Sequence, residues 1–160
     1  MKHLSKLFRK KNPIVSLESY RLDNTPKFTF QSDEKVPCKV INVYDGDTLD
    51  IAMEYGGSVY AFRIRLAGID TPELKPNKDI ENREEIIAQG VCAKEFLEKM
   101  VLDKILPIQI TGQEKYGRLL GKLYIDNATN VTINDILIMS GHAVAYDGGK
   151  KTIITPSVLE

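Results

Sequence analysis

The chain has 160 residues, 42% of them apolar and 28% charged, which is typical of one soluble globular domain with room for an extension. No apolar run approaches the roughly 18 residues that a membrane span requires, so we expect no membrane span. Basic and acidic residues are equal in number, 22 of each, and this excludes a protein that binds nucleic acid by its overall charge alone.

Residues 1–35 are predicted to be a basic N-terminal extension, disordered in part. Five lysines or arginines and no acid fall within the first twelve residues. The apolar stretch of a signal peptide does not follow them, so we expect the protein to stay intracellular. Charge runs of this kind are usually solvated tails, although a nucleic acid or a membrane surface would also suit this one.

The compact domain is predicted over residues 36–152, followed by a tail at 153–160. Apolar periodicity predicts three strands, a helix, two more strands and a short last helix. The predicted strands are Cys38–Tyr44, Thr48–Tyr55, Ser58–Leu66, Ile105–Thr111 and Leu119–Ile125, and the predicted helices are residues 90–102 and Asn134–Ser140. The polar stretch from Glu73 to about Gln89 is predicted to be a loop whose end can be helical.

This order of elements is typical of a five-stranded Greek-key barrel of OB type. The predicted fold class is therefore α+β, mostly β, with two or three helices. We expect the domain to be a monomer.

The segment VYDGDTLDI at 43–51 joins the first two predicted strands and carries two carboxylates that need different explanations. Asp45 and Gly46 between apolar residues predict a tight hairpin turn, because glycine tolerates the positive φ that such turns need. Asp47 falls on the inward, apolar face by strand parity. A carboxylate there costs free energy unless something compensates it.

A second acidic cluster follows the third predicted strand, in RLAGIDTPE at 65–73. Pro72 stiffens the backbone between Asp70 and Glu73. Hard cations such as Ca²⁺ and Mg²⁺ take carboxylates and backbone carbonyls on rigid turns as ligands. The residue types alone do not distinguish Ca²⁺ from Mg²⁺ or Mn²⁺.

Arginines supply the complementary charge. Arg63 and Arg65 share the face of the third strand that lies opposite the core, and Arg118 follows Gly117 before the fifth strand. Guanidinium groups bind phosphate in a bidentate manner and stay charged at any working pH. Acids for a metal and arginines for phosphate oxygens would suit phosphodiester cleavage. Spacing leaves open whether these clusters meet or are solvated turns and ion pairs; Arg63 is expected to pair with an acid at the surface.

Three motifs in order, DGDT at 45–48, RLAGIDTPE at 65–73 and EKYGR at 114–118, resemble the staphylococcal nuclease (thermonuclease) family. The segment at 134–146 is similar to the helix and tyrosine segment that follows in that family. The similarity covers about residues 36 to 150. The family fold, an OB barrel with added helices, agrees with the predicted order of strands.

The resemblance implies a Ca²⁺ site. Asp47 and Asp70 would bind the ion directly, together with the backbone carbonyl of Thr71 and with water. Asp45 would contact the ion through water, so for this residue the turn and the metal interpretation would both hold.

The resemblance also implies the catalytic residues. Glu73 would orient or deprotonate the attacking water. Arg65 and Arg118 would hold the scissile phosphate and stabilise its charge during an in-line attack.

Lys115, Tyr116 and Tyr146 are the implied substrate-binding residues. Lys115 and Tyr116 would contact the phosphate next to the scissile one, and Tyr146 would bind the nucleotide beside its sugar and base. The implied activity is Ca²⁺-dependent hydrolysis of DNA or RNA with little sequence preference, leaving 3′-phosphate ends. The alternative is an OB-fold module that binds nucleic acid without catalysis, as in Tudor-staphylococcal-nuclease proteins, but the acids and arginines that degenerate copies lose are present here.

Overall fold

The computed structural model describes residue 21 and residues 30–32 and 34–148. The predicted basic segment at residues 1–12 and the predicted tail at 153–160 lie outside the described residues. The predicted domain from residue 36 is described up to residue 148.

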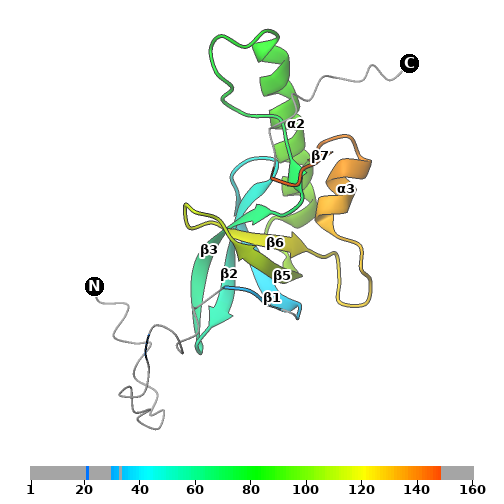
Figure 1. Cartoon of the computed structure of the whole chain (residues 1–160). Coiled ribbons are helices and arrows are strands. Elements are labelled where there is room, and N and C mark those ends of the chain that lie inside the picture. The colour runs from blue at the N-terminus through cyan, green and yellow to red at the C-terminus, as the bar shows by residue number, and fades with distance from the viewer. Residues whose placement is uncertain (1–20, 22–29, 33, 149–160) are drawn as a thin grey trace.

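Five strands form a closed barrel in the order β1-β2-β3-β6-β5 (Figure 1). They are β1 (Val36–Val43), β2 (Thr48–Tyr55), β3 (Ser58–Leu66), β5 (Ile105–Gln113) and β6 (Leu119–Leu123). Neighbouring strands are antiparallel except β3 and β6, which pair in parallel. The predicted five-stranded barrel of OB type is therefore confirmed, and the predicted bounds of the second and third strands agree with β2 and β3.

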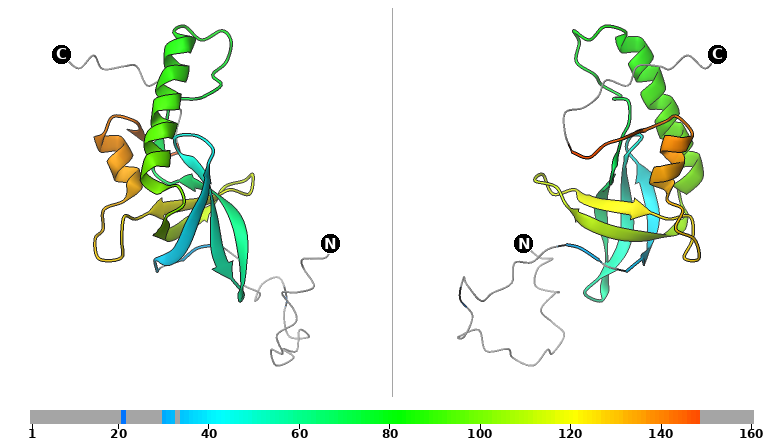
Figure 2. Two further views of the ribbon diagram at one scale, coloured as in Figure 1. Left: turned by 180° about the vertical axis from the view of Figure 1, so that it is seen from behind. Right: turned by 45° about the vertical axis from the view of Figure 1, so that its right-hand side comes forward.

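Two helices lie next to each other at one end of the barrel (Figure 2). They are α2 (Arg83–Val101) and α3 (Ile133–Met139). The sequence predicted a loop up to about Gln89 whose end can be helical, and the end of that stretch is helical, because α2 begins at Arg83. Its buried residues start only at Gly90, because the first turns extend beyond the barrel (Figure 1); those turns therefore lack the apolar periodicity on which the prediction relied.

Two short strands missed by the sequence analysis, β4 (Ile69–Asp70) and β7 (Val144–Ala145), pair with each other. Tyr146 extends this pairing, because its N–H donates to the carbonyl oxygen of Gly68 at 2.9 Å. The segment after α3 is thereby held against the segment that follows β3. No helix in the described part of the chain is long and apolar enough to cross a membrane.

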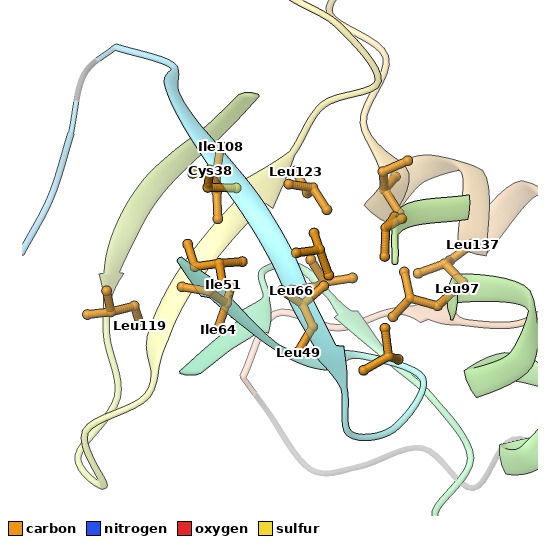
Figure 3. Close-up of a cluster of buried hydrophobic side chains, with 14 of the residues drawn as sticks. Cys38, Leu49, Ile51, Ile64, Leu66, Leu97, Ile108, Leu119, Leu123 and Leu137 are labelled. Carbon is orange, nitrogen blue, oxygen red and sulfur yellow. The ribbon is translucent and has the colours of Figure 1, made fainter. Parts of the chain in front are cut away.

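One hydrophobic core fills the barrel and continues beneath the two helices (Figure 3). Alternate residues of the strands point inward, as the period of two requires, and both helices add side chains from their inner faces. Fully buried examples from β2, β3, α2 and α3 are Leu49, Ile51, Ile64, Leu66, Leu97 and Leu137. Burial of each such side chain contributes roughly 1.5–3 kcal/mol, so the strand ends that carry polar residues rest on a rigid base.

A buried amide links α3 to this base. The side chain of Asn134 donates to the carbonyl oxygens of Ala67 at 2.8 Å and Gly121 at 3.3 Å, and it accepts a hydrogen bond from the N–H of Leu123 at 3.2 Å. Asn134 therefore fixes the turn between β3 and β4 relative to β6, just after Arg65 and just before Asp70.

Candidate active site

The three sequence motifs meet at a pocket of about 250 Å³. Its walls come from the β1–β2 turn, the end of β3, the segment after β4, the β5–β6 turn and the residue after β7. The lining residues are Asp45, Asp47, Arg65, Asp70, Thr71, Pro72, Glu73, Leu74, Glu114, Arg118 and Tyr146. Every site residue predicted from the sequence lines this pocket except Lys115 and Tyr116.

The β1–β2 turn presents Asp47 to the pocket. Tyr44 and Asp45 donate their N–H groups to the carbonyl oxygen of Thr48, at 2.9 and 3.2 Å, and the N–H of Asp47 donates to Asp45 Oδ1 at 3.1 Å. Asp45 thus closes the turn and lines the pocket at the same time. Asp47 is only 3% exposed, as strand parity predicted.

Gly46 is required at this turn, but the reason predicted from the sequence was wrong. Its φ is not positive. A Cβ at residue 46 would lie 2.8 Å from Thr71 Oγ1 and 2.9 Å from the Cβ of Ala93 on α2. The glycine therefore allows the turn to pack against Thr71 and α2.

A second glycine, in the middle of α2, serves a similar purpose. A Cβ at Gly90 would lie 2.8 Å from the carbonyl oxygen of Pro72 and 3.2 Å from that of Glu73. The helix therefore rests directly on the backbone that carries Glu73. The predicted helix began at Gly90, so the sequence did not place this glycine inside a helix and gave no signal for the contact.

Arg65 bridges the two buried acids of the pocket. Its Nη1 lies 3.0 Å from the Asp47 carboxylate, and its Nη2 lies 2.8 Å from Asp70 Oδ1 and 3.3 Å from the carbonyl oxygen of Ile69. The arginine side chain is 12% exposed, and Asp70 is 4% exposed. On the face opposite the core, to which the sequence assigned it, Arg65 therefore contacts β4.

The charges of this cluster do not balance. Burial raises the pKa of Asp47 to about 7; Arg65 and a hydrogen bond from Thr48 act against this rise, and the nearby Asp45 and Asp70 add to it. Burial alone would lower the pKa of Arg65, but the charges of Asp47, Asp70 and Glu114 raise it above the usual value. The acids of the pocket therefore favour an additional positive charge.

Glu114 was missed as a functional candidate, although it belongs to the EKYGR motif. Its Oε2 accepts a hydrogen bond from Nε of Arg118 at 2.6 Å, and its Oε1 lies 3.8 Å from Nε of Arg65. Nη1 of Arg118 lies 3.5 Å from Thr48 Oγ1. One half-buried carboxylate thus contacts both arginines of the pocket, and the four-residue spacing to Arg118 was the signal available in the sequence.

Three further predictions concern the tyrosines, Lys115 and Arg63. Tyr116 is 92% exposed, and like Lys115 it lies on the β5–β6 turn outside the pocket. Tyr146 lies inside it, with its ring centroid 6.0 Å from Cζ of Arg65. Arg63 pairs with Asp50 at 2.8 Å, which confirms the expected surface ion pair.

Comparisons with known proteins agree with this geometry. Residues 63–155 match the family model described as staphylococcal nuclease homologue. An uncharacterised protein of Methanocaldococcus jannaschii is 30% identical over 145 residues, which cover 81% of this chain and 68% of the relative. The turn with Asp45 and Asp47 precedes the segment matched by the family model, so the fold is what brings these acids to the motifs within that segment.

Two further relatives have nuclease names. An uncharacterised endonuclease of Escherichia coli is 29% identical over 68% of this chain and 60% of its own length. The staphylococcal-like nuclease CAN1 of Arabidopsis thaliana is 34% identical over 54% of this chain, but this chain spans only 23% of it. With the family model matching more than half of the sequence, the chain belongs to the family of staphylococcal nuclease homologues.

Proposed function

We propose that this chain is a metal-dependent nuclease that hydrolyses phosphodiester bonds of DNA or RNA with little sequence preference. The observation that carries the proposal is the meeting of two buried carboxylates, two arginines and Glu73 around one pocket. Buried like charges without a function are a cost to stability. The nuclease names of the relatives from E. coli and A. thaliana point to the same chemistry.

The proposed cation is Ca²⁺, held by the carboxylates of Asp47 and Asp70 and the carbonyl of Thr71, with Asp45 contacting it through water. Two observations support a Ca²⁺ ion at this place. The proposed ligand atoms are all oxygens, which hard cations prefer, and the two buried acids share the single guanidinium of Arg65. Within the described residues no three His, Cys, Asp or Glu side chains could hold a metal by themselves. Backbone and water ligands therefore have to complete the site. When bound, the cation would supply electrostatic stabilisation of the phosphate and activation of water.

The protein side chains have separate roles in the proposed reaction. Arg65 and Arg118 bind the phosphate oxygens and stabilise the charge that develops during in-line attack. Glu73 orients the attacking water or accepts its proton. Cleavage of the bond to the 5′ oxygen leaves a 3′-phosphate end.

Substrate contacts outside the phosphate complete the proposal. Lys115 and Tyr116 contact the neighbouring phosphate from the β5–β6 turn. Tyr146 binds the nucleotide beside its sugar and base, from its place next to Arg65.

The test is a cleavage assay on single-stranded DNA, supercoiled plasmid and RNA, each with Ca²⁺, Mg²⁺, Mn²⁺ or EDTA. Wild type is compared with Glu73→Gln and with Lys39→Ala, a control at a surface ion pair with Asp103. We expect Ca²⁺-dependent products with 3′-phosphate ends and a loss of about 10²-fold or more in Glu73→Gln. Mass spectrometry of the products identifies the ends.

A folded wild-type chain that binds single-stranded DNA but cleaves nothing in any of the three metals would overturn the proposal. That result would favour the binding module that keeps the barrel without the chemistry. Cleavage supported by Mg²⁺ or Mn²⁺ but not by Ca²⁺ would retain the nuclease and change the cation.

A further inference from the structure

A second, shallower hollow of about 330 Å³ adjoins the pocket, and Arg118 lines both. It lies between β3 and the β5–β6 turn, and Arg63, Ala61 and Tyr116 are among its lining residues. The roles assigned above do not include Arg63. Because Arg118 lines both hollows, a polynucleotide whose phosphate is bound by Arg118 can place its next nucleotide in the second hollow.

Arg63 is held in one orientation. Its Nε donates to Asp50 Oδ1 at 2.8 Å and its Nη2 donates to Asp50 Oδ2 at 3.2 Å, while the ring centroid of Tyr44 lies 5.1 Å from its Cζ. Neither hydrogen bond uses Nη1, which can donate to a ligand. The hydrogen bond from Arg63 lowers the pKa of Asp50, so the acid stays ionised and cancels the charge of Arg63.

Tyr116, on the β5–β6 turn, lines the same hollow. It lies in a turn that two backbone hydrogen bonds close. The N–H of Glu114 donates to the carbonyl oxygen of Arg118 at 2.8 Å, and the N–H of Gly117 donates to the carbonyl oxygen of Glu114 at 3.1 Å. At 92% exposure the ring is not part of the core. An exposed ring on a fixed turn, lining the same hollow as a guanidinium held by an ion pair, suits a flat ligand with π-faces.

We propose that the hollow between Arg63 and Tyr116 is a subsite for an unpaired nucleobase, that of the nucleotide next to the phosphate held by Arg118. The ring face of Tyr116 stacks on the base, in addition to the phosphate contact proposed above for this residue, and Nη1 of Arg63 donates to a base oxygen or ring nitrogen. A phosphate is the less suitable occupant, because Asp50 cancels the charge of Arg63 and adds a nearby negative group. This inference rests on the proposed nuclease function.

The test uses a single-stranded trinucleotide and two versions of it, each lacking the base at one end. Removal of the base that fills the hollow should raise KM about tenfold, given the usual contribution of base stacking, with little change in kcat. In Arg63→Ala, KM for the intact trinucleotide should rise several-fold and the effect of removing that base should shrink. Arg63→Lys should behave like Arg63→Ala, since lysine keeps the charge but lacks the planar fork.

The control is Lys39→Ala. Lys39 is also paired with an acid, and its side chain is 48% exposed against 49% for Arg63, but it lines neither hollow. This variant should keep both the wild-type KM and the full effect of base removal. An effect of base removal that is equal in wild type and Arg63→Ala would overturn the inference.

Binding of a labelled single-stranded oligonucleotide in EDTA separates a base contact from a phosphate contact. If Arg63 contacts a base, the slope of log Kd against log salt concentration should be the same in Arg63→Ala as in wild type. If Arg63 contacts a phosphate, the variant should reduce the slope by about one. A reduced slope would therefore overturn the base assignment. If wild type neither cleaves nor binds, the proposed function fails; if wild type cleaves and Arg63→Ala is indistinguishable from it, only this inference fails.

Discussion

At the scale of single residues, the central feature of the pocket is Asp47, a carboxylic acid that is 3% exposed. Its position was predictable from strand parity alone, because one residue before β2 the alternation already points inward. Its partners were not predictable in this way. Arg65, Asp70 and Asp47 come from three segments, and only the closed barrel and the β4–β7 pairing bring them within hydrogen-bond distance.

The raised pKa of Asp47 predicts a pH dependence of stability. Burial raises this pKa from 3.8 to about 7, so the folded state binds the proton more tightly than the unfolded state does. The resulting stability is complete below about pH 4 and is lost as the pH rises through about 7. Relative to Asp47→Asn, the metal-free wild type should therefore lose up to about 4 kcal/mol of unfolding free energy across this range.

Urea unfolding of both proteins in EDTA, at several pH values between 4 and 8, measures this difference. Titrating groups that do not interact with Asp47 act on both proteins and cancel in the comparison, whereas Asp45 and Asp70, whose charges act on Asp47, contribute to the difference. Parallel stability curves would mean that Asp47 titrates as an ordinary carboxylate.

Arg118 should be the arginine whose loss is easiest to interpret, because it is less buried than Arg65 and bridges no buried acids. We expect Arg118→Ala to lower kcat at least about 10²-fold, the usual effect of losing one electrostatic contact in a transition state. Single-turnover cleavage of single-stranded DNA measures it, with Lys39→Ala as the control of equal charge change. A rate within threefold of wild type would remove Arg118 from the site.

Glu114 should act through Arg118, because its carboxylate accepts a hydrogen bond from Nε of Arg118 at 2.6 Å. We expect Glu114→Ala to lower kcat about tenfold because Arg118 loses its fixed orientation. The double variant Glu114→Ala/Arg118→Ala should be no slower than Arg118→Ala alone, since effects of residues that act as a unit do not add. A double variant that is slower by the full product of the two effects would show an independent role, such as an action on Arg65.

At the scale of elements, the long α2 shows where the sequence was informative and where it was not. Apolar spacing predicted its second half, which packs on the barrel, and failed for the first turns, which contain half-buried but no fully buried residues. Those turns contain good helix formers such as Arg83, Glu84 and Glu85, with acids near the positive end of the helix dipole. Local propensity rather than burial therefore determines where this helix begins.

Gly90 provides a test at this scale, because replacing it by alanine should lower the unfolding free energy, whereas the same change at most helical positions raises it. At an open helical position, replacing glycine by alanine stabilises a protein by roughly 0.5–1 kcal/mol. Here the added Cβ would meet the carbonyl oxygen of Pro72 at 2.8 Å, so we expect Gly90→Ala to destabilise by about 1–3 kcal/mol, as overpacking does. Displacement of the Pro72–Glu73 backbone should also slow cleavage.

Denaturant unfolding with Ala88→Gly alongside makes this measurement specific. Ala88 is exposed on the same helix, so its replacement reports the ordinary cost of a helical glycine, about 0.5–1 kcal/mol. A stabilised Gly90→Ala protein with normal activity would show that α2 does not press on the site backbone.

At the scale of the whole molecule, the order of strands and the order of motifs were both visible in the sequence. The barrel turns that order into a site because β3 and β6 pair in parallel, which puts Arg65 opposite Leu120 and brings the β5–β6 turn next to the end of β3. The sequence could not supply this closure, since it depends on long-range pairing. It also could not reveal that Gly46 and Gly90 are needed for close contact rather than for a special backbone conformation.

The last prediction concerns the stability of the whole domain with and without metal. If Asp47 and Asp70 hold a cation that the unfolded chain cannot bind, saturating Ca²⁺ at 100 times its Kd should stabilise the fold by about 2.7 kcal/mol. That corresponds to a rise in Tm of roughly 5–15 °C for a domain of this size. The rise should be larger at pH 8 than at pH 6, because a protonated Asp47 cannot act as a ligand.

Thermal unfolding followed by circular dichroism, in EDTA and in increasing Ca²⁺, measures the shift without any assay of activity. Asp47→Asn and Asp70→Asn should unfold at the same temperature with and without Ca²⁺, while Lys39→Ala should shift as wild type does. Since Lys39 belongs to a surface ion pair, the control also reports any general effect of salt on the fold. A wild-type Tm that is indifferent to Ca²⁺ at pH 8 would mean that the two buried acids are neutralised by Arg65 alone.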